Sequence, residues 1–114
     1  MKNLVLGGGF LGMKVAEELD CQIVTDRIAD ANDVLLAVEQ YVGDGLPDVI
    51  INCIGKTGRP NVDWCESNKS ETYVANVHVP YLLAEFCKRY NINLVHVSSG
   101  CIYQGDNGGT GWSE

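Results

Sequence analysis

Short apolar runs alternate with amphipathic stretches along this chain. Four runs bounded by glycine or polar residues are typical of buried strands; they cover residues 2–6, 21–25, 48–53 and 92–97. Between the runs, apolar residues recur at helical spacing in residues 10–19, 31–42 and 70–89. Strands that alternate with helices predict an α/β domain with a parallel sheet and right-handed crossovers. The run at 48–53 is apolar on both faces, so we expect it at the centre of the sheet.

Each helical segment also has a predicted buried face. In residues 10–19 this face holds Leu11, Val15, Ala16 and Leu19. In residues 31–42 it holds positions 34, 35, 38, 41 and 42, and Gly43 and Gly45 are expected to end the helix. In residues 70–89 it holds positions 74, 77, 81, 82, 84 and 87. Pro80 should kink this last helix or mark a boundary near Val79.

The composition fits one small domain. The chain has 114 residues, of which 46% are hydrophobic and 20% charged, enough for one buried core. Its net charge is −7, from 8 basic and 15 acidic residues, and only Lys88 and Arg89 are adjacent basic residues. Binding to nucleic acid or to an anionic membrane depends on clustered Lys and Arg. No apolar run approaches the length of a membrane span, so we expect neither partner.

Cysteine usage predicts a cytoplasmic protein. The five cysteines are an odd number without a C-x-x-C pair, which favours reduced thiols over a disulfide framework. No metal-ligand spacing is present, so no metal is expected. Cys21 and Cys87 lie on apolar faces and are expected in the core. His78 and His96 also lack ligand spacing and are expected to pack or to face solvent.

The strongest candidate site is a G-x-G-x-x-G motif between the first predicted strand and the first helix: Gly7-Gly8-Gly9-Phe10-Leu11-Gly12. In that context the motif binds a dinucleotide. Gly7 would permit the tight turn, Gly9 would let the backbone approach a pyrophosphate, and Gly12 would let helix and strand pack closely. The helix N-terminus would offer free N–H groups to the phosphates. The alternative is a plain glycine-rich turn.

Two further segments lie where strands are predicted to end. Asp26 and Arg27 follow the second strand. An acid at this point suits the ribose 2′-hydroxyl of NAD, whereas an arginine suits a 2′-phosphate, so the choice between NADH and NADPH stays open. Both could also be solvated turn charges. The central strand ends in Asn52-Cys53-Ile54-Gly55, at the edge where α/β sheets bind ligands, although a simple turn would fit too.

The fourth candidate follows the last predicted strand. Ser99 could hydrogen-bond a substrate carbonyl, and Cys101 could act as an acid or base if its thiol is tuned toward neutral pH. A lone cysteine is also often a small buried apolar residue. Together the motifs predict a Rossmann-like parallel sheet with helices on both faces, truncated after about the fifth strand.

With these motifs in order, the chain resembles the extended short-chain dehydrogenase/reductase superfamily. The most specific stretch, residues 55–66, resembles the bifunctional UDP-4-keto-6-deoxyglucose 3,5-epimerase/4-reductases of rhamnose synthesis, and dTDP-4-dehydrorhamnose reductases are more distantly similar. The resemblance covers the whole chain but only the amino-terminal part of the family. It implies an NAD(P)H-dependent epimerase/reductase that acts on a nucleotide-linked 4-keto-6-deoxyhexose.

The resemblance also implies roles for particular residues. The dinucleotide fingerprint is matched by Gly7, Gly9 and Gly12, with Phe10 and Leu11 between them. The strand end Asn52–Gly55 would line the cofactor, and Lys56 and Thr57 would begin the loop that faces the active site. Asn76 matches a site-supporting asparagine on the long helix. Ser99 matches the catalytic Ser/Thr position and Cys101 the epimerisation acid/base.

The chain departs from the family in one important respect. None of its tyrosines has a lysine four residues later, so the family's Tyr-x-x-x-Lys pair is absent and the polypeptide alone should not complete the reduction. Residues 104–114 are interpreted as the active-site loop before the missing tyrosine, which a downstream segment or another chain would supply. The exposed edge of a truncated sheet makes a homo-oligomer a further expectation. The alternative is a non-catalytic dinucleotide-binding or protein-interaction module.

Overall fold

A four-stranded parallel sheet forms the centre of the molecule. The computed structural model describes residues 2–43, 45–55 and 66–97. The strands are β1 (Asn3–Leu6), β2 (Gln22–Val24), β3 (Val49–Asn52) and β4 (Asn93–His96), and their spatial order is β2-β1-β3-β4. This confirms the parallel α/β fold and the central position of residues 48–53. About five strands were expected, and the described residues form four.

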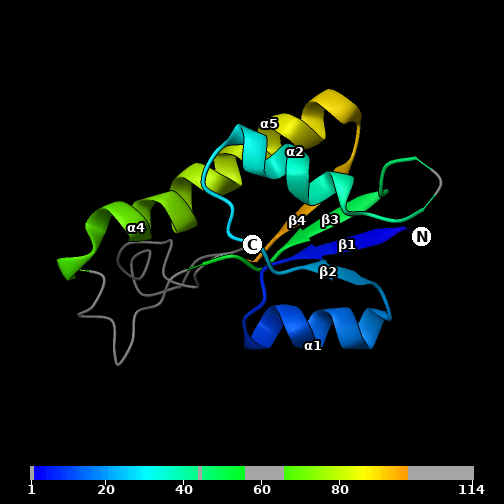
Figure 1. Cartoon of the computed structure of the whole chain (residues 1–114), viewed down its shortest axis with the longest axis horizontal. Coiled ribbons are helices and arrows are strands. Elements are labelled where there is room, and N and C mark those ends of the chain that lie inside the picture. Colours follow the sequence, from blue (N-terminus) through cyan, green and yellow to red (C-terminus); the bar gives the residue numbers. More distant parts are fainter. Residues whose placement is uncertain (1, 44, 56–65, 98–114) are drawn as a thin grey trace, which may run out of the picture.

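Helices cover both faces of the sheet (Figure 1). The helix α1 (Phe10–Leu19) lies on one face, with the boundaries that the sequence predicts. The other face carries α2 (Ala31–Glu39) and a long continuous helical segment. That segment consists of α4 (Lys69–Tyr73), a π-helical turn η1 (Val74–His78) and α5 (Val79–Tyr90). Figure 1 shows α4 extending beyond the carboxyl edge of the sheet.

The core has two layers because successive strand residues point to opposite faces. Leu4, Leu6 and Ile50 pack toward α2 and α5, in a cluster that includes Val34 and Leu83. On the α1 side, a smaller cluster contains Val5, Ala16, Val49 and Ile51. Burial on both faces explains why β1 and β3 are almost wholly apolar in sequence.

The helix α2 is shorter than expected. It begins with a reciprocal cap, since Asp30 accepts from the Asp33 N–H at 2.9 Å and Asp33 accepts from the Ala29 N–H at 2.9 Å. It ends at Glu39 rather than Val42. The Gln22 side chain bonds both backbone groups of Val42, at 2.7 and 3.0 Å. These bonds replace the helical ones that Val42 would otherwise make.

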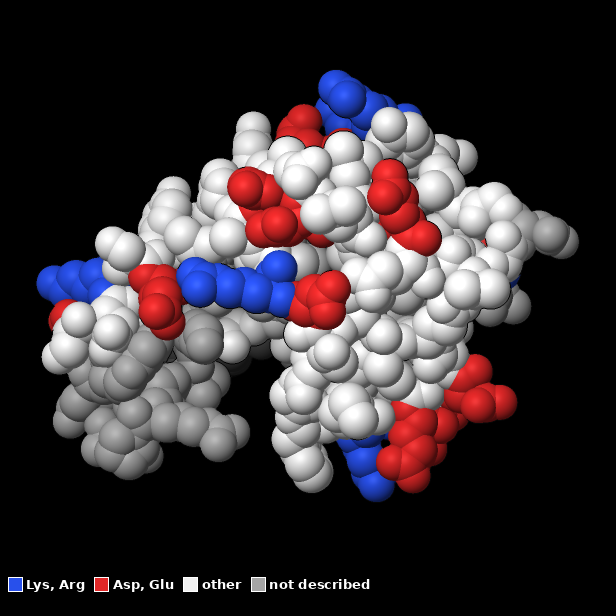
Figure 2. All heavy atoms as spheres, viewed as in Figure 1, with Lys and Arg blue, Asp and Glu red and all other residues white. Residues whose placement is uncertain are grey.

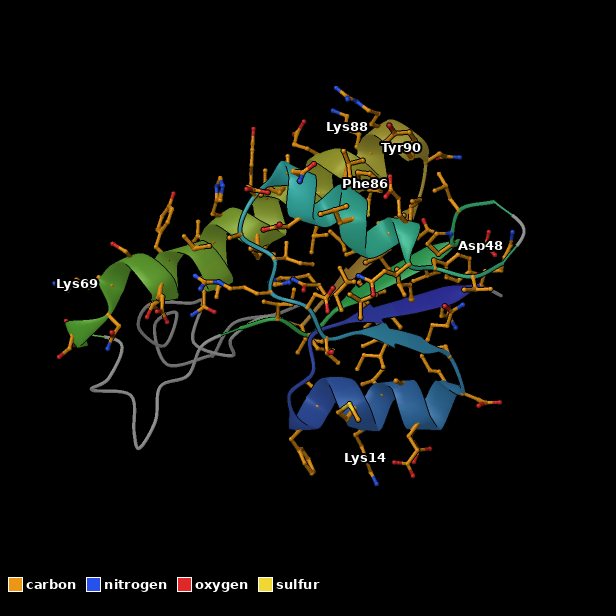
Figure 3. All side chains as sticks on the ribbon, in the orientation of Figure 1. Lys14, Asp48, Lys69, Phe86, Lys88 and Tyr90 are labelled. Carbon is orange, nitrogen blue, oxygen red and sulfur yellow. The ribbon has the colours of Figure 1, made fainter. Side chains whose placement is uncertain are left out.

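Pro80 shapes the long helix as expected, with a boundary at Val79. Proline has no N–H to donate to the carbonyl of residue 76, so the wider π-helical turn just before it accommodates the missing bond. At the far end of α5, Phe86 and Tyr90 lie side by side with ring centroids 4.7 Å apart (Figure 3).

The predicted buried face of the long helix is wrong in part. The buried residues are Ala75, Val79, Leu83 and Cys87. The predicted Val77 and Tyr81 are 50% and 63% exposed, and Ala84 is exposed as well. The buried residues repeat at every fourth position through the π-helical turn, so they form a narrow stripe that leaves out Val77, Tyr81 and Ala84.

The predicted face of α1 is also wrong in part. Ala16 is buried and Val15 packs against the smaller cluster, as predicted, but Gly12 is buried as well, and Leu11 and Leu19 are 45% and 46% exposed. A glycine contributes nothing to an apolar periodicity, yet Gly12 packs directly against the backbone of Gly7. In residues 31–42, Val34 and Val38 are buried as predicted, whereas Leu35 and Val42, which lies beyond the end of α2, are exposed. Cys87 is buried as expected, and Cys21 is half-buried against the smaller cluster.

On the face shown in Figure 2, the basic side chains of the described residues lie in separate small areas, with acidic and uncharged residues between them. Lys14 points away from the sheet on α1, and Lys88 points outward from α5 on the opposite side of the molecule (Figure 3). Within the described ranges, no helix is both long and apolar enough to cross a membrane.

Candidate functional site

A pocket of about 330 Å³ opens at the carboxyl edge of the sheet. From β1 the chain proceeds to β2 on one side, and β3 then pairs on the other side of β1. This divergence creates a crevice between the ends of β1 and β3, the place where open α/β sheets bind ligands. The lining comes from segments after three elements and from the long helix: Gly7, Gly8, Gly9, Thr25, Asp26, Arg27, Ile28, Cys53, Ile54, Gly55, Glu71, Val74 and Ala75.

Gly7 and Gly12 let the backbone segments of this crevice touch. Gly7 has φ +107°, and a Cβ there would lie 2.9 Å from the carbonyl carbon of Cys53 and from the nitrogen of Ile54. A Cβ on Gly12 would overlap the carbonyl oxygen of Gly7. Both glycines are therefore required by packing of the protein itself, as the G-x-G-x-x-G motif predicts.

Gly9 has a different role, because a Cβ there would meet no atom of the described residues within 4 Å. It is the N-cap of α1 and lines the pocket, and no side chain caps the helix. The first-turn N–H groups of α1 thus begin at the pocket wall. Phe10 and Leu11, also predicted to bind cofactor, do not line the pocket, and Phe10 is 86% exposed.

The part of the pocket wall that follows β2 carries the predicted acidic and basic side chains side by side in sequence. Asp26 and Arg27 both line the pocket and both are exposed to solvent. The Asp26 Oδ2 accepts a hydrogen bond of 2.8 Å from Gln40 Nε2, at the end of α2. Ile28, buried beside them, anchors this wall in the larger core cluster.

Asn52 supports the pocket from behind rather than lining it. Its side chain is fully buried. The Oδ1 accepts from the Ile54 N–H at 3.1 Å, and Nδ2 lies 3.1 Å from Nδ1 of His96 on β4. Because Oδ1 is already bonded to an N–H, Nδ2 donates to His96, whose proton then resides on Nε2. His96, expected only to pack or to face solvent, therefore helps to hold the strand end that lines the pocket.

Replacing Asn52 with leucine should lower the free energy of unfolding by about 1–3 kcal/mol, because the Ile54 N–H loses its acceptor. Urea unfolding followed by circular dichroism measures the loss. His96→Ala leaves the Ile54 bond intact and should cost less. An Asn52→Leu protein as stable as the parent would contradict this role.

The remaining pocket wall comes from the long helix. Glu71, Val74 and Ala75 share one side of it by their spacing, and sequence reasoning missed all three. The predicted Asn76 is adjacent: its Oδ1 lies 3.3 Å from where a Cβ on Gly55 would be. On the sheet side, burial raises the pKa of the Cys53 thiol, so this pocket-lining thiol stays protonated and uncharged at neutral pH.

Phe10, Leu11 and Asn76 do not line the pocket, and the other predicted site residues fall into three groups. Those brought together at the pocket are Gly7, Gly9, Asp26, Arg27, Cys53, Ile54 and Gly55. Gly12 and Asn52 support it from beneath. Lys56, Thr57, Ser99 and Cys101 lie outside the described residues. In the part of the chain that the structure describes, no group of three His, Cys, Asp or Glu side chains could hold a metal ion.

Comparison with known proteins points to rhamnose-forming reductases. A bifunctional dTDP-4-dehydrorhamnose 3,5-epimerase/reductase from Arabidopsis thaliana is 35% identical over 102 residues, covering 89% of this chain and 33% of the relative. A dTDP-4-dehydrorhamnose reductase from Mycobacterium tuberculosis is 35% identical over 104 residues, covering 91% and 32%. A trifunctional UDP-glucose 4,6-dehydratase/UDP-4-keto-6-deoxy-D-glucose 3,5-epimerase/UDP-4-keto-L-rhamnose-reductase from Arabidopsis thaliana is 40% identical over 113 residues, covering 93% and 16%.

The chain spans a third or less of the length of these curated relatives. No solved structure matches it. The model of the RmlD substrate binding domain matches residues 1–114, the whole chain. The fold agrees with this match, because the glycine turn lies at the switch point of a parallel sheet. The chain therefore belongs to the RmlD substrate-binding domain family.

Proposed function

We propose that this chain is the dinucleotide-binding portion of an NAD(P)H-dependent reductase that acts on a nucleotide-linked 4-keto-6-deoxyhexose. The observation that carries the proposal is the space in front of Gly9. The pocket wall there is bare backbone, at the N-terminus of α1, where a side chain would have room but none is present. A cradle of this kind suits a pyrophosphate.

The pocket residues divide the binding work between them. Backbone at Gly7–Gly9 and the start of α1 would hold the pyrophosphate, and Asp26 or Arg27 would meet the adenosine ribose. Cys53–Gly55 would lie along the nicotinamide half, where Gly55 leaves room for close passage. The bound cofactor supplies the hydride for reduction of the keto group. The uncharged Cys53 thiol and half-buried Ile54 would shield that half from water.

The substrate and its chemistry are inferred from the relatives, whose names specify dTDP- or UDP-linked 4-keto sugars and both epimerase and reductase activities. Ser99 would hold the keto oxygen, and Cys101 would move protons at the carbons that are epimerised. Lys56, Thr57 and Asn76 would support the sugar side of the site. NADH or NADPH is the cofactor, and a cytoplasmic location is part of the proposal.

A second candidate function rests on the sequence itself. Among these 114 residues no tyrosine is followed by a lysine four positions later. A chain without that pair could bind a dinucleotide, or a protein partner, without catalysing the reduction. Addition of a segment that supplies Tyr-x-x-x-Lys, with NADH oxidation as the readout, separates the two candidates: restored turnover favours the reductase.

Gly9→Ala provides the test of cofactor binding. The new methyl group meets no atom of the described residues, so the free energy of unfolding should fall by only about 1 kcal/mol or less, the cost of alanine in place of glycine at an N-cap, while the methyl group occupies the space proposed for the pyrophosphate. Calorimetric titration should show at least about tenfold weaker binding of both NADH and NADPH. Met13→Ala, on the exposed side of the same helix, is the matched control. Failure of the parent chain to bind either cofactor, or full binding by Gly9→Ala, would refute the proposal.

A further inference from the structure

The Gln40 side chain reaches the pocket wall although it is distant from it in sequence. Gln40 follows the last residue of α2, and its backbone N–H donates to the carbonyl of Ala37 at 3.2 Å. The helix end therefore sets where its side chain begins. From there Nε2 donates to Oδ2 of Asp26, 14 residues earlier, at 2.8 Å. Both side chains are exposed, and Asp26 lines the pocket.

We propose that Gln40 is a positioning residue that makes the pocket prefer NADH to NADPH. This inference rests on the proposed function. Gln40 occupies one oxygen of the Asp26 carboxylate, which leaves Oδ1 to accept from a ribose 2′-hydroxyl. A carboxylate held in one place also repels a 2′-phosphate, because two anions would have to share the same wall.

The chemistry of the glutamine amide supports this role. A lysine or arginine at position 40 would also orient Asp26 but would cancel its charge. The neutral amide donates a hydrogen bond and leaves the full negative charge facing the pocket. In the described part of the chain Arg27 forms no ion pair with Asp26, so the carboxylate is held by Gln40 and not neutralised by its neighbour.

Gln40 thus determines which of Asp26 and Arg27 meets the adenosine ribose in this proposal. Both residues line the same wall, and either could meet the adenosine ribose. With Gln40 bonded to Asp26, the acid is in a fixed orientation. Without that bond, Asp26 would be free to turn toward solvent or toward the Arg27 guanidinium, and the wall would lose its selectivity for the 2′-hydroxyl.

The test compares four chains: the parent, Gln40→Met, Asp26→Ala and the double variant. Methionine preserves the length of the side chain and removes the donor. Calorimetric titration with NADH and with NADPH should show that the parent prefers NADH. Gln40→Met should weaken NADH binding by about threefold to tenfold, the range expected for one hydrogen bond, and should change NADPH binding less. In the Asp26→Ala background, Gln40→Met should have no further effect on either cofactor.

Gln22→Met is the matched control. This substitution also removes glutamine hydrogen bonds near α2, those to Val42 just beyond its end, but it does not touch Asp26. It should leave the ratio of the two affinities unchanged. The role of Gln40 would be overturned, but not the proposed function, if Gln40→Met weakened binding of both cofactors equally or left the ratio of the two affinities unchanged. A parent chain that prefers NADPH would have the same consequence. Absence of binding by the parent chain would overturn the proposed function and this inference together.

Discussion

Gly12→Ala should destabilise the protein by about 3 kcal/mol, at the upper end of the cost of overpacking. The added methyl group would overlap the carbonyl oxygen of Gly7 and lie 3.0 Å from the Gly7 carbonyl carbon. Both are backbone atoms, so no side chain can rotate away. Relief requires α1 to move off the sheet, and this movement would also separate Ala16 from Val5 and Ile51 in the smaller core cluster.

Urea unfolding followed by circular dichroism measures this loss, and Gly9→Ala is the control. The two variants carry the same substitution three residues apart in the same motif. Gly9 has open space where Gly12 has backbone, so the variants should have opposite profiles: Gly12→Ala loses stability, and Gly9→Ala loses cofactor binding. Similar stability of Gly12→Ala and Gly9→Ala would show that α1 does not pack on the glycine turn as described.

Leu83→Ala should cost about 2–5 kcal/mol, the range for removing a large aliphatic side chain from a core. Leu83 on α5 is fully buried and belongs to the larger core cluster, together with Ile50 and Val34. Its loss would leave a cavity between α5 and the sheet. For a domain of this size such a loss is a large part of the total stability, so the midpoint of urea unfolding should fall markedly.

Tyr81→Ala is the matched control on the same helix. Apolar periodicity in the sequence places Tyr81 on the buried face, whereas the structure leaves it 63% exposed. Truncation of Tyr81 should therefore cost about 0.5 kcal/mol or less. If Tyr81→Ala were more damaging than Leu83→Ala, the face predicted from the sequence would be correct and the helix rotation described here would be wrong.

Local sequence was sufficient for the elements and for the main pocket segments. The strands around Leu4, Ile50 and Leu94 are short apolar runs, and the glycine motif follows β1 directly. In a parallel sheet the carboxyl ends of all strands meet at one edge. Gly7–Gly9, Asp26 and Cys53–Gly55 could therefore be assigned to one site before any contact between them was known.

Other parts of the site depend on contacts between residues that are distant in sequence. Gln40 reaches Asp26 across 14 residues, and His96 reaches Asn52 across 44. Neither pair has a local motif, and Glu71 enters the pocket wall only because the long helix extends past the edge of the sheet.

Sequence alone thus determined the α/β order, the glycine turn and the strand ends that meet at the pocket, because each depends on local backbone preferences and on the common direction of parallel strands. The tertiary structure decided which helix faces are buried and which side chains hold Asp26 and Asn52 in place. Helix rotation is set by the surface against which the helix packs. Gly12 lies on the buried face of α1 because the backbone of the glycine turn packs opposite it, and Leu83 lies on the buried face of α5 because the core cluster packs opposite it. These opposing surfaces are not part of the sequence of either helix.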